Sequence, residues 1–211
     1  DQNEDGAGGI DVEIIDVSTP SAPTRATSIS ILGNLADAVD TMINGTTLYV
    51  LLDVHPSSGD TDSIYSYDIT TPTSPSQLDT ITLSGSGNLA TEGMYISGNR
   101  LYVGQYTAGL NIINIADPSN LTSAGEYDLG INGVHDVLIK GNYAILATTG
   151  SGTTDDITVL NISNEASISV ATTLDLKYTV PIGLELSENT LYVGTSTGGV
   201  MTVDVTDPSA P

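Results

Sequence analysis

The first residues of the chain have the types and spacing of a calcium-binding loop. Asp1, Asn3 and Asp5 alternate ahead of a glycine, as in loops of the form D-x-[DN]-x-D-G. Calcium takes about six to eight oxygen ligands, and alternate side chains of such a loop can converge on one ion. Val12 stands where a bidentate acid is expected, with Asp11 beside it. We predict calcium binding by Asp1, Asn3, Asp5 and Asp11, with a solvated acidic loop as the alternative.

A second group of ionisable residues recurs at one place in related segments. Asp40 and Asp136 each precede a turn glycine by five residues, and Glu92 and His135 lie one position earlier in their own segments. If these segments form the strands nearest a common axis, the four side chains are candidates for lining a central channel and binding a cation or ligand. The alternative, which we favour, is that they hydrogen-bond adjacent strands near the axis. Successive strand residues point to opposite faces, which argues against a proton shared by His135 and Asp136.

No catalytic residue is predicted. The other histidine, His55, has no serine or acid at the spacing of a hydrolytic triad. Cysteine is absent, which excludes thiol catalysis, cysteine-ligated zinc and disulfide bonds. Two N-x-[ST] sequons in expected turns, at Asn44 and Asn120, are candidate glycosylation sites if the protein is exported. A third, at Asn161, falls within an expected strand and is interpreted as structural.

The charge of the chain excludes several classes of partner. Its 26 acidic side chains against 4 basic ones give a formal net charge of -22. Such a surface repels phosphate backbones and anionic headgroups, so no binding to nucleic acid is expected. No apolar run is long enough to cross a bilayer, so no membrane-spanning segment is expected in this chain. Hydrophobic residues make up 39% of the chain, which is enough to form a core.

One phrase occurs five times along the chain. Its copies read VEIIDVSTPSAP (12–23), IYSYDITTPTSP (64–75), LNIINIADPSNL (110–121), ITVLNISNEASI (157–168) and GVMTVDVTDPSAP (199–211). One polar position recurs at steps of 43 to 52 residues, as Asp16, Asp68, Asn114, Asn161 and Asp204. A spacing of this size indicates one structural unit per copy.

Each later phrase follows a hairpin. GMYISGNRLYVG (93–104) and DVLIKGNYAILA (136–147) are pairs of apolar runs around a tight turn in which Gly accepts a positive φ. The phrase adds a third strand, and a short fourth strand follows its prolines, which fix the turn between them. In the fourth copy Glu165 and Ile168 replace both prolines, so we expect a looser turn there.

Units of four strands at this period indicate a β-propeller, with a β-sandwich as the runner-up architecture. We expect an all-β chain forming a single propeller, with a partial blade over 1–33, blades over 34–86, 87–130 and 131–176, and a partial blade over 177–211. Because the terminal units are incomplete, we expect a segment of a larger propeller. The stretch 34–42 is ambiguous between helix and strand. Tyr49, Tyr102 and Tyr192 recur on second strands, and packing between blades explains them better than sugar stacking.

The repeated phrase resembles the LVIVD repeat of bacterial and archaeal surface and secreted proteins. The resemblance is clearest at GLNIINIADPSN (109–120) and at 198–211, and it extends over nearly the whole chain. It implies a β-propeller fold built of LVIVD-type blades. It implies no activity and no catalytic residues, because the family shares none and a fold does not determine function.

These features lead us to expect a non-catalytic, extracellular or cell-surface propeller. Its expected partners are a protein, a glycan or copies of itself, for example in a surface layer or filament, with calcium as the candidate stabilising ion. The alternative is a calcium-dependent propeller hydrolase of the lactonase or phytase type. That alternative needs carboxylates converging on the channel from several blades, and the last unit offers only Ile182 and Gly183 at the matching place.

Overall fold

The computed structural model describes residues 12–31, 36–54, 61–84, 91–105, 108–130, 133–149, 156–177 and 179–211. These residues form seventeen β-strands in five antiparallel sheets, numbered here as blades in chain order. Blade 1 consists of β1 (Val12–Asp16) and β2 (Thr24–Ile29), and blade 5 of β15 (Pro181–Ser187), β16 (Thr190–Thr195) and β17 (Gly199–Asp204).

The three blades between them have four strands each. Blade 2 consists of β3 (Ala36–Asn44), β4 (Thr47–Val54), β5 (Thr61–Asp68) and β6 (Ser76–Thr82). Blade 3 consists of β7 (Thr91–Ser97), β8 (Arg100–Gln105), β9 (Gly109–Asn114) and β10 (Thr122–Tyr127). Blade 4 consists of β11 (Gly133–Lys140), β12 (Tyr143–Thr149), β13 (Ile157–Asn161) and β14 (Ser169–Leu174).

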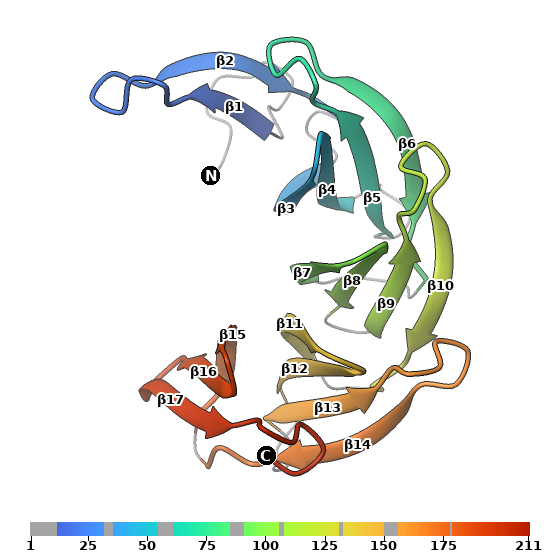
Figure 1. Ribbon diagram of the computed structural model, residues 1–211, viewed down its shortest axis with the longest axis vertical. Coiled ribbons are helices and arrows are strands. Elements are labelled where there is room, and N and C mark those ends of the chain that lie inside the picture. Colours follow the sequence, from blue (N-terminus) through green and yellow to red (C-terminus); the bar gives the residue numbers. More distant parts are fainter. Residues whose placement is uncertain are drawn as a thin grey trace.

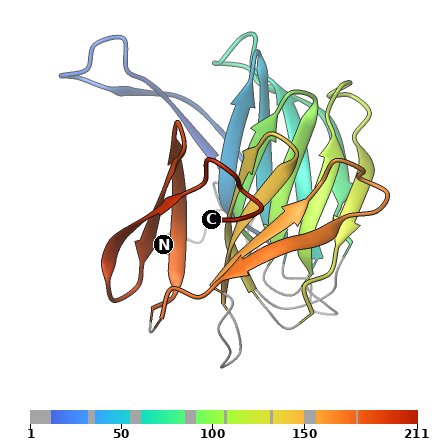
Figure 2. The same cartoon turned by 60° about the horizontal axis from the view of Figure 1, so that its bottom comes forward.

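Strands that neighbour each other in a blade are consecutive in the chain, so each blade is a meander. Figure 1 shows the blades side by side along an arc, with β3, β7, β11 and β15 on its inside and β2, β6, β10 and β14 on its outside. Figure 2 shows the middle blades stacked face to face. The expectation of an all-β chain is confirmed, and the ambiguous stretch 34–42 enters strand β3 from residue 36.

The turns follow from the residues that occupy them. The hairpins between first and second strands place Gly45, Gly98 and Gly141 at φ of 61°, 58° and 61°, a backbone region that glycine enters without strain. In blade 5 the same turn is made by Glu188, with φ of 54°, so this hairpin forms without a glycine. The inner hairpin is therefore present in every blade from blade 2 to blade 5.

The recurring Asp or Asn at the end of each third strand makes a side-chain turn. Its carboxylate or amide oxygen accepts a hydrogen bond from the backbone N–H two residues later, in the pairs Asp16–Ser18, Asp68–Thr70, Asn114–Ala116, Asn161–Ser163 and Asp204–Thr206. Asp and Asn both provide this acceptor, which explains why they alternate there. The following turn keeps its backbone hydrogen bond even in the fourth copy, where Ser167 N lies 2.9 Å from Asn164 O, so the expected loosening is not seen in this bond.

The hydrophobic core lies between blades. Four clusters of buried side chains each join consecutive blades, and the one between blades 2 and 3 includes Leu51 and Ile64 from blade 2 with Leu101 and Val103 from blade 3. The middle strands are buried on both faces, which explains their nearly continuous apolar sequence. Among the described residues, no helix is long and apolar enough to span a membrane.

Candidate functional site

Two carboxylates of the inner strands, those of Asp40 and Asp136, join neighbouring blades. Asp40 on β3 accepts a hydrogen bond at Oδ2 from Met94 N of blade 3, at 2.9 Å, and one at Oδ1 from Thr41 N, at 2.7 Å. Asp136 on β11 repeats this arrangement, with Oδ2 2.7 Å from Leu184 N of blade 5 and Oδ1 2.8 Å from Val137 N. Both oxygens of each carboxylate are thus engaged by backbone N–H groups of two blades.

Burial raises the pKa of the Asp136 carboxyl above its ordinary value. The hydrogen bonds from Leu184 and Val137 lower the pKa, and the negative charges of Asp40 and Glu185 raise it again. Burial opposes the charged form, whereas hydrogen bonds to the carboxylate favour it. The two backbone donors are therefore what makes an ionised Asp136 tolerable between the blades.

Glycine alternates with aspartate at this inner position. Blades 3 and 5 have Gly93 and Gly183 where blades 2 and 4 have the aspartates. A Cβ added at Gly93 would lie 2.9 Å from Asp136 Oδ1, and one at Gly104 would lie 2.5 Å from Cγ1 of Val134. We call blades 2 and 4 the Asp-type and blades 3 and 5 the Gly-type. The Gly-type face leaves room for the aspartate and valine of the blade that follows it.

The residues one position earlier are the extra residues of β-bulges. The pairing of each inner strand with its neighbour slips by one residue at Val39, Glu92, His135 and Ile182. A bulge re-aims side chains, so the strict alternation of faces assumed for His135 and Asp136 does not hold at this point. Only the backbone of Glu92 belongs to the described part of the chain.

A series of hydrogen-bonded polar side chains is buried between blades 2 and 3, and reasoning from the sequence did not predict it. Asp62 Oδ2 accepts a hydrogen bond from Gln105 Nε2 at 2.6 Å, and the Gln105 carbonyl accepts one from the Asn111 amide. The Ser84 hydroxyl lies 2.8 Å from Asn111 Oδ1 and also contacts the Glu126 carboxylate. Gln105 and Asn111 are each only 2% exposed. The sequence did contain a sign of these contacts, because Gln105 and Asn111 are polar residues within the otherwise apolar strands LYVGQ and LNII.

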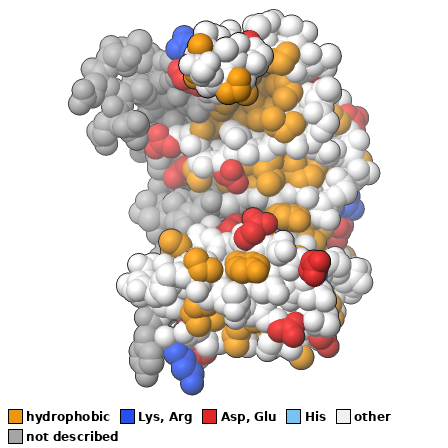
Figure 3. Space-filling model, turned by 60° about the vertical axis from the view of Figure 1, so that its left-hand side comes forward, with side chains coloured by type: hydrophobic (Ala, Val, Ile, Leu, Met, Phe, Trp, Pro, Cys, Tyr) orange, Lys and Arg blue, Asp and Glu red, His pale blue; other side chains and the backbone are white. Residues whose placement is uncertain are grey.

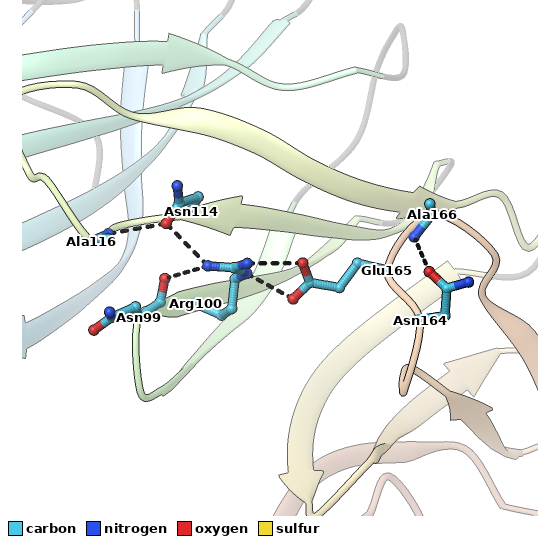
Figure 4. Close-up of polar contacts among 7 residues, drawn as sticks. All are labelled: Asn99, Arg100, Asn114, Ala116, Asn164, Glu165 and Ala166. Atoms are coloured by element: carbon cyan, nitrogen blue, oxygen red, sulfur yellow. Dashed lines mark hydrogen bonds and ion pairs between the residues drawn. The ribbon is translucent and has the colours of Figure 1, made fainter.

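An ion pair between blades 3 and 4 was also missed. Arg100 on β8 donates from Nε to Glu165 Oε1 at 2.7 Å and from Nη2 to Oε2 at 3.0 Å, and its Nη1 donates to Asn114 Oδ1 at 3.0 Å (Figure 4). The hydrogen bond with Glu165 raises the pKa of the Arg100 guanidinium. Glu165 stands where blade 3 has Pro118. This replacement of a proline by a charged residue was the sign in the sequence that Glu165 pairs with a basic side chain.

The remaining predicted residues have these positions. Asp1, Asn3, Asp5 and Asp11 lie outside the described residues, so their calcium site stays a prediction. Asn44 and Asn120 are exposed, at the end of β3 and in the turn before β10, and their glycosylation stays a prediction too. Asn161 makes the side-chain turn described above. Within the described ranges, no three His, Cys, Asp or Glu side chains lie close enough together to hold a metal ion.

Meander sheets packed face to face along an arc, with their first strands innermost, define a β-propeller. The LVIVD repeat model matches residues 7–31, 90–129, 133–175 and 183–211, which together are more than half of the chain. The chain belongs to the LVIVD repeat family. It is also similar to the crystal structure of the computationally designed Ika4 protein, with a TM-score of 0.58, 14% identity, and coverage of 83% of this chain and 95% of that one. No curated protein sequence matches the chain.

Proposed function

We propose that the chain is a non-catalytic, extracellular or cell-surface β-propeller that presents loops to a protein or glycan partner. The observation that supports this most is the use of the inner acids. Asp40 and Asp136 direct both carboxylate oxygens to backbone N–H groups and so hold blades together. A hydrolase of the calcium-dependent kind needs such acids free to converge on an ion at the axis.

The connections between strands support a binding role for one edge of the arc. In a meander, the turns after first and third strands lie at one edge and the other connections lie at the opposite edge. The first kind are uniform in length: two residues after each first strand, as at Gly45 and Gly98, and seven residues after each third strand. The connections from second to third strands differ in length, covering 55–60, 106–108, 150–156 and 196–198 in successive blades. Variable loops on a rigid scaffold are where binding residues concentrate.

The acidic surface supports an extracellular setting and calcium as a stabilising ion. A net charge of -22 attracts cations and keeps a protein soluble in a salty medium. Calcium would be bound by the loop that contains Asp1, Asn3, Asp5 and Asp11, which supplies hard oxygen ligands.

The test compares thermal unfolding with hydrolysis in the same samples. The melting temperature is measured in EDTA, in magnesium and in calcium, and turnover of model esters and phosphate monoesters is followed in parallel. We expect a calcium-specific rise in melting temperature that is lost in the double variant Asp1→Asn, Asp5→Asn, with no turnover in any sample. Calcium-dependent turnover would instead support the hydrolase. For the partner, a glycan array is probed with the chain and with a variant whose loop 55–60 is replaced by Ser-Thr-Gly from 196–198, and binding is expected only with the native loop.

A further inference from the structure

The turns between first and second strands share one backbone geometry in blades 2, 3 and 4. Gly45, Gly98 and Gly141 have φ of 61°, 58° and 61°, and each is the first of two residues between paired strands. The carbonyl of the second turn residue accepts a hydrogen bond from the residue after the third strand, in the pairs Thr46–Ile69, Asn99–Ile115 and Asn142–Ile162. The three turns therefore have equivalent backbones, and they differ in the residue that precedes the glycine.

Of these three turns, the one in blade 2 has an asparagine before its glycine. Asn44 precedes Gly45, whereas Ser97 and Lys140 hold the same place in blades 3 and 4. Asn44 is exposed, and no other asparagine of the described residues is followed by a glycine. A Cβ built at Gly45 would meet nothing within 4 Å, so the surroundings of this residue are open. An accessible asparagine side chain thus lies next to a backbone nitrogen that no side chain shields.

An Asn-Gly pair of this kind can react without an enzyme. The backbone nitrogen of the glycine attacks Cγ of the asparagine, so that a bond forms between these two atoms and the bond from Cγ to the side-chain nitrogen breaks. The side-chain nitrogen leaves as ammonia, which includes the proton lost by the glycine nitrogen. One water molecule then opens the five-membered succinimide at either of its two carbonyl carbons, which gives aspartate or isoaspartate. Glycine favours the attack because it has no Cβ and its backbone is less restricted than that of other residues.

We propose that Asn44 is a site of spontaneous deamidation, with Gly45 N as the attacking atom and water as the co-reactant. Each event adds a negative charge to a chain whose formal net charge is -22, and Figure 3 shows acidic side chains over the face of the molecule that it views. The aspartate product keeps the main chain as it is. The isoaspartate product lengthens the main chain by one carbon atom at the two-residue turn, where Asn44 pairs with Thr47.

Deamidation also acts on a candidate glycosylation site. Asn44, Gly45 and Thr46 form an N-x-[ST] sequon, and a glycan on this sequon would be attached through the side-chain nitrogen of Asn44. The same nitrogen leaves as ammonia during deamidation. The two modifications therefore exclude each other, and a chain that deamidates first can no longer be glycosylated at this turn. This inference goes beyond the proposed function, because it holds whatever partner the propeller binds.

The experiment follows the full chain, purified from a host that attaches no glycans, during incubation at mildly alkaline pH. Mass spectrometry of the intact chain measures the mass, and electron-transfer fragmentation of its peptides locates the change and separates aspartate from isoaspartate. The mass is expected to rise by the difference between an oxygen atom and an NH group, with both products at residue 44. Parallel incubation in urea gives the rate in the unfolded chain. A residue 44 that remains asparagine in the folded chain but deamidates in urea overturns the proposal.

Three variants test whether the Asn-Gly pair itself is the cause. Asn44→Ser copies the Ser97-Gly98 turn of blade 3 and is expected to abolish the change at this turn. Ser97→Asn creates the same pair in the equivalent exposed turn of blade 3, and deamidation is expected there at a similar rate. Thr46→Ala removes the sequon and is expected to leave the rate at Asn44 unchanged. Deamidation at position 97 of the Ser97→Asn variant without deamidation at Asn44 would contradict the proposal. Circular dichroism and the melting temperature establish that all variants are folded.

Discussion

The joint between blades 2 and 3 and the joint between blades 3 and 4 have similar hydrophobic cores but different polar contacts. At the first joint, Asp40 Oδ2 accepts a hydrogen bond from Met94 N, and Asp79 Oδ2 accepts one from Leu121 N at 2.7 Å. At the second, glycine replaces the inner aspartate, and Arg100 pairs with Glu165 near the outer turn. Besides the series of hydrogen-bonded polar side chains that includes Asp62, Gln105 and Asn111, the first joint pairs single aspartates with backbone N–H groups that any residue but proline supplies, whereas the ion pair of the second joint needs two matched side chains.

The largest expected effect comes from filling the glycine hollow of the second joint. Gly104→Val places a side chain on Val134 and forces blades 3 and 4 apart, so the free energy of unfolding is expected to fall by about 3 kcal/mol. Gly194→Val at the equivalent position of blade 5 is the matched control and is expected to change it little. Urea denaturation of both variants at low protein concentration measures the difference. Equal losses would show that Val134 is not what limits the space.

The next effect comes from removing the acceptor of the first joint. Asp40→Ala leaves Met94 N and Thr41 N without their acceptor, which costs about 2 kcal/mol of stability. Hydrogen exchange at the Met94 amide is expected to accelerate, while exchange at Leu184, which is bonded to Asp136, stays unchanged. An equal acceleration at both amides would mean that the whole arc, and not this joint, has been weakened.

A smaller effect is expected at the ion pair, because both of its side chains are about three-tenths exposed. Arg100→Thr and Glu165→Pro, which copy Thr47 and Pro118 from the first joint, are each expected to cost about 1 kcal/mol or less. The double variant is expected to recover most of the loss, because proline needs no charged partner. A double-mutant cycle by urea denaturation measures the coupling. Strictly additive losses would contradict a specific pairing.

The smallest effect at neutral pH is expected from the side-chain turns. Hydrogen bonds from Ser18, Thr70 and Thr206 hold the pKa values of Asp16, Asp68 and Asp204 below their ordinary value. A carboxyl with a lowered pKa in the folded state stabilises the protein above its unfolded pKa, and this contribution is lost as the pH falls through the folded pKa.

Changing Asp16, Asp68 and Asp204 to Asn keeps a side-chain oxygen that accepts the hydrogen bond of the turn, as Asn114 and Asn161 do in blades 3 and 4. Stability at pH 7 is expected to stay nearly the same, and its decline below about pH 4 is expected to become shallower. Thermal unfolding across this pH range measures the slope. A slope equal to that of the native chain would mean that other carboxyl groups control acid unfolding.

The all-β propeller fold could be predicted because the repeat is visible in the sequence. Hairpin glycines, the prolines and the spacing of Asp16 and its equivalents all specify the same unit, so local signals agreed with the architecture. The turn at Asn164 shows that a unit can lose its prolines and keep its hydrogen bond. Because the same signals recur in several repeats, the fold can be predicted even where one copy departs from the pattern.

The polar contacts between blades could not be predicted because their partners are not visible in one unit. The acceptor role of Asp136 depends on a backbone N–H forty-eight residues later, and a backbone donor leaves no trace in the sequence. The bulge at His135 is likewise a property of strand pairing, and it removes the alternation on which the argument about His135 and Asp136 rested. Arg100 and Glu165 are sixty-five residues apart and needed the arc to bring them together.

The meander within each blade also determines how the molecule responds to force. Core clusters and polar contacts connect each blade to its immediate neighbours, so tension applied at the two ends of the chain is carried by one joint after another. The weakest joint opens first and the blades on either side keep their own strand pairing. Under stretching, the chain is therefore expected to lengthen in discrete steps, each of which separates one pair of neighbouring blades.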